Sequence, residues 1–351
     1  MPLIYHCDLP QVTHIIAVYN EEKIIGAKVE NTINQHYPKD KINHIFVTDG
    51  SDDDTVEILN RKEGIKHLHA NERKGKLAAI NRIIPEVEDE IIIFSDANAM
   101  LSKDALWQIV QHFQNKKVGA VAGEKRVVAN IDDDAAGSGE NIYWKYESLI
   151  KNWESRISST VGGAGELFAI RSNLYRSPNE EIIVEDLLIT MNVIKQGYTI
   201  VYEPKALASE KPSKNIHEEM KRKVRISAGG IQSMIHLLPL LNIFKYGTIS
   251  IFLLSHRYMR WLFAPLALIA LLISSFCVMP NNHIVYNTII YSQFGFYMLA
   301  LLGYLFANNK LRIKYLFIPF YFVFMHYCVI LGFFKLLKGE GTVIWKKTGR
   351  R

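Results

Sequence analysis

The residues best suited to chemistry follow one apolar stretch of the chain. Residues 91–95 read Ile-Ile-Ile-Phe-Ser, and Asp96 and Asn98 come directly after them. Such a run predicts a buried central strand, and ligands of open α/β sheets bind beyond the carboxyl ends of the strands. An Asp-x-Asn pair at that edge offers two oxygen ligands that suit Mg²⁺ or Mn²⁺ together with a substrate diphosphate. The alternative is that Asp96 only caps a helix that begins near Ser102.

Two other segments place charge where strands are expected to end. Residues 49–55 follow the expected strand 41–48 and hold four acids, more than a helix start needs. Gly75 lies between Lys74 and Lys76 at the start of an expected helix, and such a helix start can bind a diphosphate. Lysine and glycine are also common in loops, so this motif alone is weak evidence for a diphosphate site and needs the support of the other motifs.

Residues 162–196 contain a small-residue turn and, further along, an acidic pair. Residues 162–171 contain three glycines before an expected strand, so bare backbone can approach a ligand there. Glu185 and Asp186 begin a predicted helix that continues to about Gln196. Acids in the first turn of a helix also have a purely structural use, because they complement the helix dipole.

Alternating strands and helices predict an α/β fold for this region. Strands are expected at 12–18, 41–48, 65–69, 91–95 and 118–122, with helices between them, which is typical of a parallel sheet. Residues 131–141 are rich in Asp, Gly and Ala and are predicted to form a loop. Residues 142–157 carry aromatic and apolar side chains at helical spacing, a pattern more typical of a core than of a sugar-binding platform.

The last third of the chain is much more apolar than the rest. We predict membrane helices at 261–279, 286–307 and 315–337, each near the roughly 20 residues that a bilayer requires. Residues 231–260 are too interrupted for a confident span and suit interfacial helices. The predicted domains are therefore 1–230, a cytoplasmic α/β domain; 231–260, interfacial amphipathic helices; 261–338, membrane helices; and 339–351, a basic tail.

Charge distribution sets the expected orientation. The connection between the second and third spans carries Lys310, Arg312 and Lys314, so the positive-inside rule places it in the cytoplasm, on the side of the N-terminal domain. Three crossings would then leave the basic tail outside. This conflict predicts either an additional crossing near residues 237–254 or a re-entrant third segment containing Pro319.

The overall composition excludes several classes of protein. The formal net charge of +6 comes from basic residues near the membrane junction and the tail, which suits an anionic membrane surface, and no basic-aromatic motif indicates nucleic acid. The cysteines, Cys7, Cys277 and Cys328, have no spacing typical of a disulfide framework or zinc site. The N-terminus lacks the pattern of a secretory signal, so the expected location is the cell (inner) membrane with the catalytic domain in the cytoplasm.

Four of these motifs, in this order, resemble the family 2 glycosyltransferases. They are Val-Tyr-Asn-Glu-Glu after the first strand, Asp-Gly-Ser-Asp-x-x-Thr after the second, Gly-Lys before a helix, and Asp-Ala-Asn after the central strand. The resemblance extends over about residues 12–232 and points to the polysaccharide synthase branch. It implies a GT-A fold, an α/β domain with a mixed, mainly parallel sheet, followed here by C-terminal transmembrane helices.

The resemblance also implies roles for particular residues. Those of the donor site are Asn20, Glu22 and Asp49 for the base and ribose of a nucleotide sugar, Lys76 and Asp96 for its diphosphate, and Asp96 with Asn98 for the metal, Mg²⁺ or Mn²⁺. Those of the acceptor site are Gly163, Gly165 and Arg225, with Asp186 as the catalytic base and Glu185 as its supporting neighbour. The commoner pattern has Asp where this chain has Asn98, and an amide adds no charge to the metal site.

Two segments depart from the pattern of processive synthases or match it only in part. A Gln-x-x-Arg-Trp motif is replaced by Arg222-x-x-Arg225-Ile226, which puts processive polymerisation in doubt. The same segment also suits a basic amphipathic helix lying on anionic lipid. Residues 345–350 are similar to the loop with which membrane synthases close over the nucleotide, and a solvated basic tail is the alternative.

The implied activity is that of an inverting glycosyltransferase. A nucleoside-diphosphate sugar, expected to be a UDP-sugar, would donate its sugar to a polysaccharide or lipid-linked acceptor at the cytoplasmic face of the lipid bilayer. Two other readings stay open: a non-catalytic membrane subunit that binds a glycan or a partner, and a sugar nucleotidyltransferase. The latter class opens with a glycine-rich loop after the first strand, where this chain has residues 19–22, Tyr-Asn-Glu-Glu.

Overall fold

An eight-stranded sheet organises the first part of the chain. The computed structural model describes residues 9–128, 135–278, 283–308 and 314–340. The strands lie in the order β3-β2-β1-β4-β7-β6-β8-β5. Their bounds are β1 (Val12–Val18), β2 (Ile42–Asp49), β3 (Lys66–Ala70), β4 (Ile91–Asp96), β5 (Met100–Leu101), β6 (Val118–Val127), β7 (Leu167–Arg171) and β8 (Thr199–Glu210). This mixed sheet confirms the predicted α/β fold.

Strand direction explains why the candidate residues meet. β1 pairs in parallel with both β2 and β4, and β3 continues this parallel half. β7 runs antiparallel to β4 and to β6, and thereby brings the second half of the domain against the first. The carboxyl ends of β1, β2 and β4 lie at one edge of the sheet. Asp49 is the last residue of β2 and Asp96 the last residue of β4, so both lie at this edge. β4 is buried almost completely, as its apolar run predicts.

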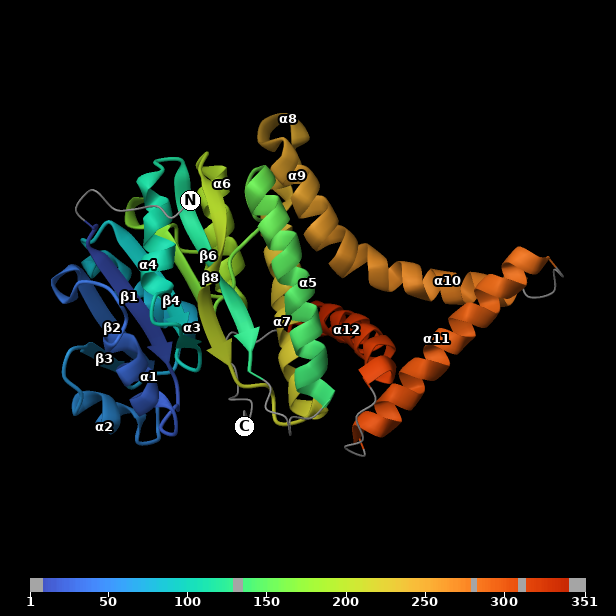
Figure 1. Ribbon diagram of the computed structural model, residues 1–351, viewed down its shortest axis with the longest axis horizontal. Helices are drawn as coiled ribbons and strands as arrows, with labels where there is room; N and C mark the ends of the chain where they lie inside the picture. Colours follow the sequence, from blue (N-terminus) through green and yellow to red (C-terminus); the bar gives the residue numbers. More distant parts are fainter. Residues whose placement is uncertain (1–8, 129–134, 279–282, 309–313, 341–351) are drawn as a thin grey trace.

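Short helices cover the sheet (Figure 1). They are α1 (Ile25–Ile33), α2 (Thr55–Asn60), α3 (Lys76–Asn81), α4 (Ala105–Val110) and α6 (Glu185–Lys195). α4 begins at Ala105 with Asp104 in the N-cap position, so Asp96 is not the cap of that helix. The capping alternative for Asp96 is therefore wrong.

The long helix α5 (Ala135–Ile157) corrects two expectations. Residues 135–141 belong to this helix and not to a loop, because the helix that packs along β6 and β8 continues through their alanines; residues 131–134 lie outside the described residues. The apolar stripe is also not core: Tyr146, Leu149 and Trp153 are 54%, 46% and 58% exposed. The helix instead turns a charged face inward, where partners from other elements neutralise it.

The helix α7 (Ile216–Leu237) corrects a third expectation. Two of its basic residues cannot lie on a membrane surface, since Arg222 and Lys223 are 7% and 4% exposed, whereas Lys221 is exposed. Glu219, one helical turn away, accepts hydrogen bonds from Arg222 and lies 3.5 Å from the Nζ of Lys223. These acidic partners inside the domain hold the basic side chains there. α7 also runs through residue 230, the domain boundary that the sequence suggested.

Three helices are long and apolar enough to cross a membrane: Thr248–Val278, Ile284–Phe306 and Leu316–Leu337. The first joins α9 (Thr248–Phe252), a π-helix η6 (Leu253–Phe263) and α10 (Ala264–Val278). Before it, residues 238–246 form only short turns, η5 (Leu238–Leu241) and α8 (Ile243–Tyr246), so the described chain has no separate crossing there. The three predicted spans are confirmed as candidate membrane helices.

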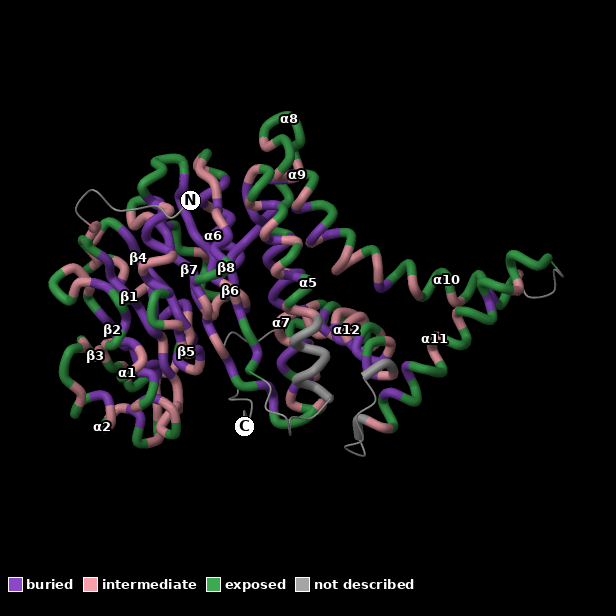
Figure 2. The backbone as a smooth tube through the Cα atoms, in the orientation of Figure 1, coloured by how far each residue is buried: buried purple, intermediate pink, exposed green. Residues whose placement is uncertain are grey.

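These helices differ in how they meet the α/β domain. α10 and α11 (Ile284–Asn308) extend away from the sheet and are mostly exposed, whereas α12 (Lys314–Leu337) returns and packs along α7 (Figures 1 and 2). Phe320, Phe324 and Cys328 of α12 are buried in that contact. The loop-like motif predicted at residues 345–350 lies outside the described residues.

Candidate active site

A cavity of about 970 Å³ lies between the sheet edge and the C-terminal helices. Its walls come from the end of β4, the glycine turn before β7, the start of α6, and the helices α5, α7, η6 and α12. Eight of the predicted site residues line it together: Lys76, Asp96, Asn98, Gly163, Gly165, Glu185, Asp186 and Arg225. Asn20, Glu22 and Asp49 are not among its lining residues.

Lys76 lies at the centre of the acidic part of this cavity. The preceding Gly75 has a φ of +103°, a left-handed conformation that suits glycine, and α3 begins at Lys76. The Nζ of Lys76 lies 2.6 Å from Oδ1 of Asp96 and 2.7 Å from Oε1 of Glu185. Burial alone would lower the pKa of Lys76, but Asp96 and Glu185 outweigh it and raise that pKa. Lys76 therefore carries a fixed positive charge beside two carboxylates.

Asp186 has different surroundings from Glu185, its neighbour in the chain. It makes no ion pair with any residue that the structure describes, and its Oδ1 accepts a hydrogen bond from the backbone N–H of Leu187 at 2.9 Å. Burial and the charge of Glu185 raise the pKa of Asp186 to about 7, against the opposing effect of Lys76. A carboxyl group with such a pKa can accept a proton near neutral pH.

Gly163 and Gly165, both in the turn at 162–165, have separate structural roles. A Cβ atom on Gly165 would lie 3.3 Å from Nζ of Lys76 and 3.5 Å from Oδ2 of Asp186, so the missing side chain leaves both groups open to the cavity. The N–H of Gly163 donates to Oγ1 of Thr190 at 2.9 Å, and a Cβ there would lie 2.9 Å from Cγ2 of the same residue. Gly163 thus fixes the turn against α6.

Arg225 closes the opposite side from α7. Burial lowers its pKa, while Glu185 and Asp96 act in the other direction. Its charge is therefore directed at the same carboxylates that surround Lys76. Both arginines of this segment line the cavity, but Arg222 is bound in ion pairs with Glu219 and, at 4.0 Å, with Glu210.

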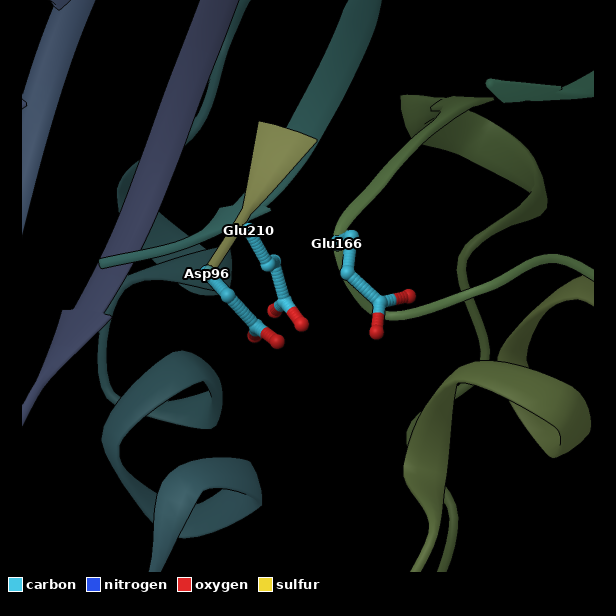
Figure 3. Close-up of side chains that lie close together, drawn as sticks. All are labelled: Asp96, Glu166 and Glu210. Carbon is cyan, nitrogen blue, oxygen red and sulfur yellow. The ribbon is translucent and has the colours of Figure 1, made fainter. Parts of the chain in front are cut away.

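Three carboxylates could hold a cation at the edge of the cavity (Figure 3). Oxygens of Asp96, Glu166 and Glu210 all lie within 4.8 Å of one another. The Oδ1 of Asn98 is buried and has no hydrogen-bond partner among the described residues. This set of hard oxygen donors fits Mg²⁺ or Mn²⁺. In the structure the Nζ of Lys125 bonds to Glu166 and lies 2.8 Å from Glu210, which neutralises both.

The comparisons with known proteins agree with this geometry. Residues 13–174 match the family model described as glycosyl transferase family 2. The chain carries a family 2 glycosyltransferase domain. A poly-beta-1,6-N-acetyl-D-glucosamine synthase of Staphylococcus epidermidis is 24% identical over 304 residues, which are 84% of this chain and 72% of the relative. A beta-monoglucosyldiacylglycerol synthase of Trichormus variabilis is 31% identical over 53% of this chain and 41% of its own length.

A solved structure shares the fold of the glycosyltransferase domain and its appended helices. The mannosyltransferase PcManGT from Pyrobaculum calidifontis, in complex with GDP-Man and Mn²⁺, superposes with a TM-score of 0.74 at 21% identity. The match covers 95% of this chain and 88% of that one. At this identity the likeness shows the fold, a GT-A-like mixed sheet followed by candidate membrane helices. The sequence matches relate the family 2 domain at residues 13–174 to polysaccharide and glycolipid synthases.

In this domain the motif after β1 and the motif after β2 are joined by hydrogen bonds. Asn20 has a φ of +52°, and its Oδ1 accepts a hydrogen bond from the N–H of Asp52 at 3.0 Å. The N–H of Glu22 donates to Asp53 at 3.3 Å. Asp49 is buried, and its carboxylate accepts hydrogen bonds from the backbone N–H groups of residues 74 and 75 at 3.0 and 2.7 Å. Asp49 thereby fixes the turn that presents Lys76.

Sequence reasoning missed several residues of the glycosyltransferase site. Glu166 directly follows the glycine turn at 162–165, whereas Glu210 ends β8, a strand that the sequence analysis did not predict. Lys28 on α1 was also missed: it is fully buried, and its Nζ donates to Oγ of Ser95 at 3.0 Å and to the carbonyl of Ala99 at 2.6 Å. It supports the turn that carries Asp96. Burial lowers the pKa of Lys28 to about 7.

Proposed function

We propose that the protein is an inverting glycosyltransferase that transfers one sugar from a nucleoside-diphosphate sugar to a hydroxyl of a polysaccharide or lipid-linked acceptor. One observation carries the proposal. Asp186 borders the same cavity as Lys76 and Asp96, yet Lys76 pairs with Asp96 and Glu185 and leaves Asp186 without an ion pair among the described residues. The site thus holds a proton acceptor beside a separate, cationic place for a leaving diphosphate.

The proposed reaction is a single displacement. The acceptor hydroxyl forms a bond to the anomeric carbon, Asp186 takes the hydroxyl proton, and the bond from that carbon to the diphosphate oxygen breaks. Lys76 and Arg225 stabilise the negative charge that grows on the leaving group. A divalent cation held by Asp96, Glu166, Glu210 and Asn98 would supply further charge neutralisation when bound.

The comparisons support the substrate classes of this proposal. PcManGT is described with GDP-Man and Mn²⁺, which supports a nucleotide sugar and a divalent cation here. The relatives named for polysaccharide and glycolipid synthesis support a glycan or a lipid as the acceptor. We retain a UDP-sugar as the expected donor, with Asn20, Glu22 and Asp49 ordering the loops around its base and ribose.

We further propose that the domain works at the cytoplasmic face of the inner membrane. The three candidate membrane helices and the basic connection at residues 310–314 support this placement. Because α12 packs on α7, the membrane part and the catalytic part would form one unit. The division of the chain at residues 230, 260 and 338 stays part of the same proposal.

The test is a donor panel run on the detergent-solubilised full chain. UDP-, GDP- and dTDP-sugars are incubated with Mg²⁺ or Mn²⁺, with and without a membrane lipid extract, and nucleoside diphosphate release is measured. We expect one donor to be consumed, faster with the extract, and the Asp186→Asn variant to be inactive. A protein that binds a donor but releases no nucleoside diphosphate under any of these conditions would instead be a binding subunit.

A further inference from the structure

The helix α5 has the reverse of the usual polarity. Its buried residues include Glu147, Lys151 and Glu154, which are 2%, 3% and 5% exposed, while its apolar residues face outward. A helix on a globular domain normally buries its apolar side and exposes its charges. Glu147 and Lys151 also line the catalytic cavity. The inner face of α5 is therefore a charged wall of the site and not part of the hydrophobic core.

Cations from the membrane junction gather at this wall. The Nη2 of Arg260 donates to Glu147 at 2.8 Å, and the Nη2 of Arg257 lies 3.6 Å from the same carboxylate. His256 lies between the two glutamates, 3.1 Å from Glu147 and 2.7 Å from Glu154. The acids are thus already engaged by η6.

Lys151 is the cation that this arrangement does not neutralise. It makes no ion pair and no hydrogen bond with the residues described, and its Nζ lies 5.9 Å from the ring centres of Trp144 and Tyr202. Arg257 and Arg260 line the same cavity, and Nε of Arg257 and Nη1 of Arg260 are buried without a hydrogen-bond partner among the described residues. Burying charged donors without partners is costly. An anion that accepted hydrogen bonds from these donors would therefore be stabilised at this wall. Burial lowers the pKa of Lys151, and a bound anion would oppose this.

The neighbouring wall of the same cavity is apolar. Most of the residues by which α12 lines it are apolar, together with Trp261 near the end of η6; the lining residues of α12 are Ile318, Tyr321, Phe322, Met325, His326 and Val329. α12 is one of the three candidate membrane helices. A hydrocarbon chain that leaves the bilayer beside α12 would meet side chains of its own polarity up to the catalytic carboxylates.

We propose that Lys151, Arg257 and Arg260 bind the phosphate group of an amphiphilic acceptor whose hydrocarbon chain lies against α12 and whose hydroxyl reaches Asp186. This inference rests on the proposed function and narrows its acceptor to a phosphate-bearing lipid. The phosphate stays unchanged in the reaction, since only the hydroxyl is glycosylated. The diphosphate of the donor takes the separate place beside Lys76 and Asp96.

Binding of octyl phosphate, a short amphiphile, tests the subsite without any turnover. Its dissociation constant is measured by tryptophan fluorescence on the full chain in dodecyl maltoside, beside inorganic phosphate and octyl glucoside. We compare the wild type with Lys151→Met, with Lys151→Arg, which keeps the charge, and with Lys145→Met, an exposed lysine of the same helix. Because all variants are measured in the same detergent, the fraction of the probe that partitions into micelles is the same and does not affect the ratio of dissociation constants.

We expect Lys151→Met to weaken octyl phosphate binding about tenfold, the usual weight of a charge-assisted hydrogen bond, and Lys151→Arg and Lys145→Met to keep it within about twofold. Octyl glucoside and inorganic phosphate should each bind far more weakly than octyl phosphate. Equal binding of octyl phosphate by the wild type and Lys151→Met overturns the subsite, and equal binding of inorganic and octyl phosphate overturns the lipid part.

Nucleoside diphosphate affinity separates this site from that of the donor. If Lys151→Met weakens binding of the nucleoside diphosphate as much as that of octyl phosphate, the cations serve the donor and the inference is wrong. The proposed function can fail independently: a chain that consumes no nucleotide sugar but still discriminates octyl phosphate through Lys151 would keep the subsite and lose the transfer reaction.

Discussion

The Nζ of Lys76 lies 2.7 Å from Oε1 of Glu185, whereas Asp186, the next residue, has no ion pair in the described chain. Successive residues of an α-helix point about 100° apart, so one acid of the pair turns to Lys76 while the other borders Gly165 and the open cavity. Glu185 and Asp186 are chemically similar, but their different contacts suit them to different roles. Glu185 holds the lysine, and Asp186 is left to exchange a proton.

We predict that Glu185→Gln reduces transfer modestly, by less than about tenfold, because Lys76 keeps its contact with Asp96. The variant also removes a charge that raises the pKa of Asp186, so the acid limb of the pH profile should move to lower pH. Steady-state rates across pH 5.5–9 measure both effects, with the exposed Glu180→Gln as the matched control. A loss of three orders of magnitude together with disappearance of the acid limb would indicate that Glu185 itself is the base.

The raised pKa of Asp186 predicts how the wild type responds to pH. A base must be ionised, so kcat/KM should rise as the pH increases through about 7, the pKa of Asp186 in the ligand-free protein. Below that pH the carboxyl is protonated and cannot accept the hydroxyl proton. The plot of log kcat/KM should fall with unit slope on the acid side. A rate that is flat from pH 5 to 8 would exclude Asp186 as a titrating base.

Metal dependence should follow the carboxylate cluster. We predict that Asp96→Ala abolishes metal-dependent turnover, and that Glu166→Gln and Glu210→Gln raise the Mn²⁺ concentration needed for half-maximal activity. Asn98→Asp should keep activity and lower that concentration, because it adds charge to the same oxygen set. Titration of Mn²⁺ into chelator-treated protein measures all four variants. Full activity of Asp96→Ala in metal-free buffer would refute this assignment.

Lys28 should make stability depend on pH. Its pKa is about 7 in the folded protein and near 10.5 when exposed, so between these values the unfolded chain binds a proton that the folded chain does not. The free energy of unfolding should therefore rise with pH over that window, and Lys28→Met should lose this rise. Thermal unfolding in detergent at pH 7 and 9.5 measures it, with exposed Lys39→Met as the control. An identical pH response of wild type and Lys28→Met would contradict the prediction.

The sequence predicted the strands and the sheet edge well, for a local reason. Apolar runs such as 91–95 can only be buried, and polar residues directly after them must lie at the carboxyl ends of strands. Asp49 and Asp96 could be placed at that edge on this basis, whereas Lys76 and Asp186 were assigned from the resemblance to family 2. Glu166 and Glu210 could not be placed in this way, because β7 and β8 bring them to Asp96 through strand pairings that no local pattern encodes.

The reversed helix α5 shows a second limit of sequence reasoning. Its spacing predicted a helix, but an apolar stripe is normally the buried side. Glu147 is buried because Arg257 and Arg260, more than a hundred residues later, provide its partners. Arg222 of α7 also lies 4.0 Å from a carboxylate on another element, Glu210 of β8, in addition to its pair with Glu219 on its own helix. Burial of charge depends on such tertiary partners and is invisible to periodicity.

The central claim is that Asp186 is the base of a sugar transfer, and Asp186→Asn tests it most directly. The amide keeps the shape of the side chain and the start of α6 but cannot take a proton. Donor affinity is titrated, and transfer is followed by nucleoside diphosphate release, on the same preparation of the variant. We predict near-normal donor affinity with transfer reduced by about two to four orders of magnitude, the usual weight of general base catalysis. Transfer by Asp186→Asn at the wild-type rate would contradict the account.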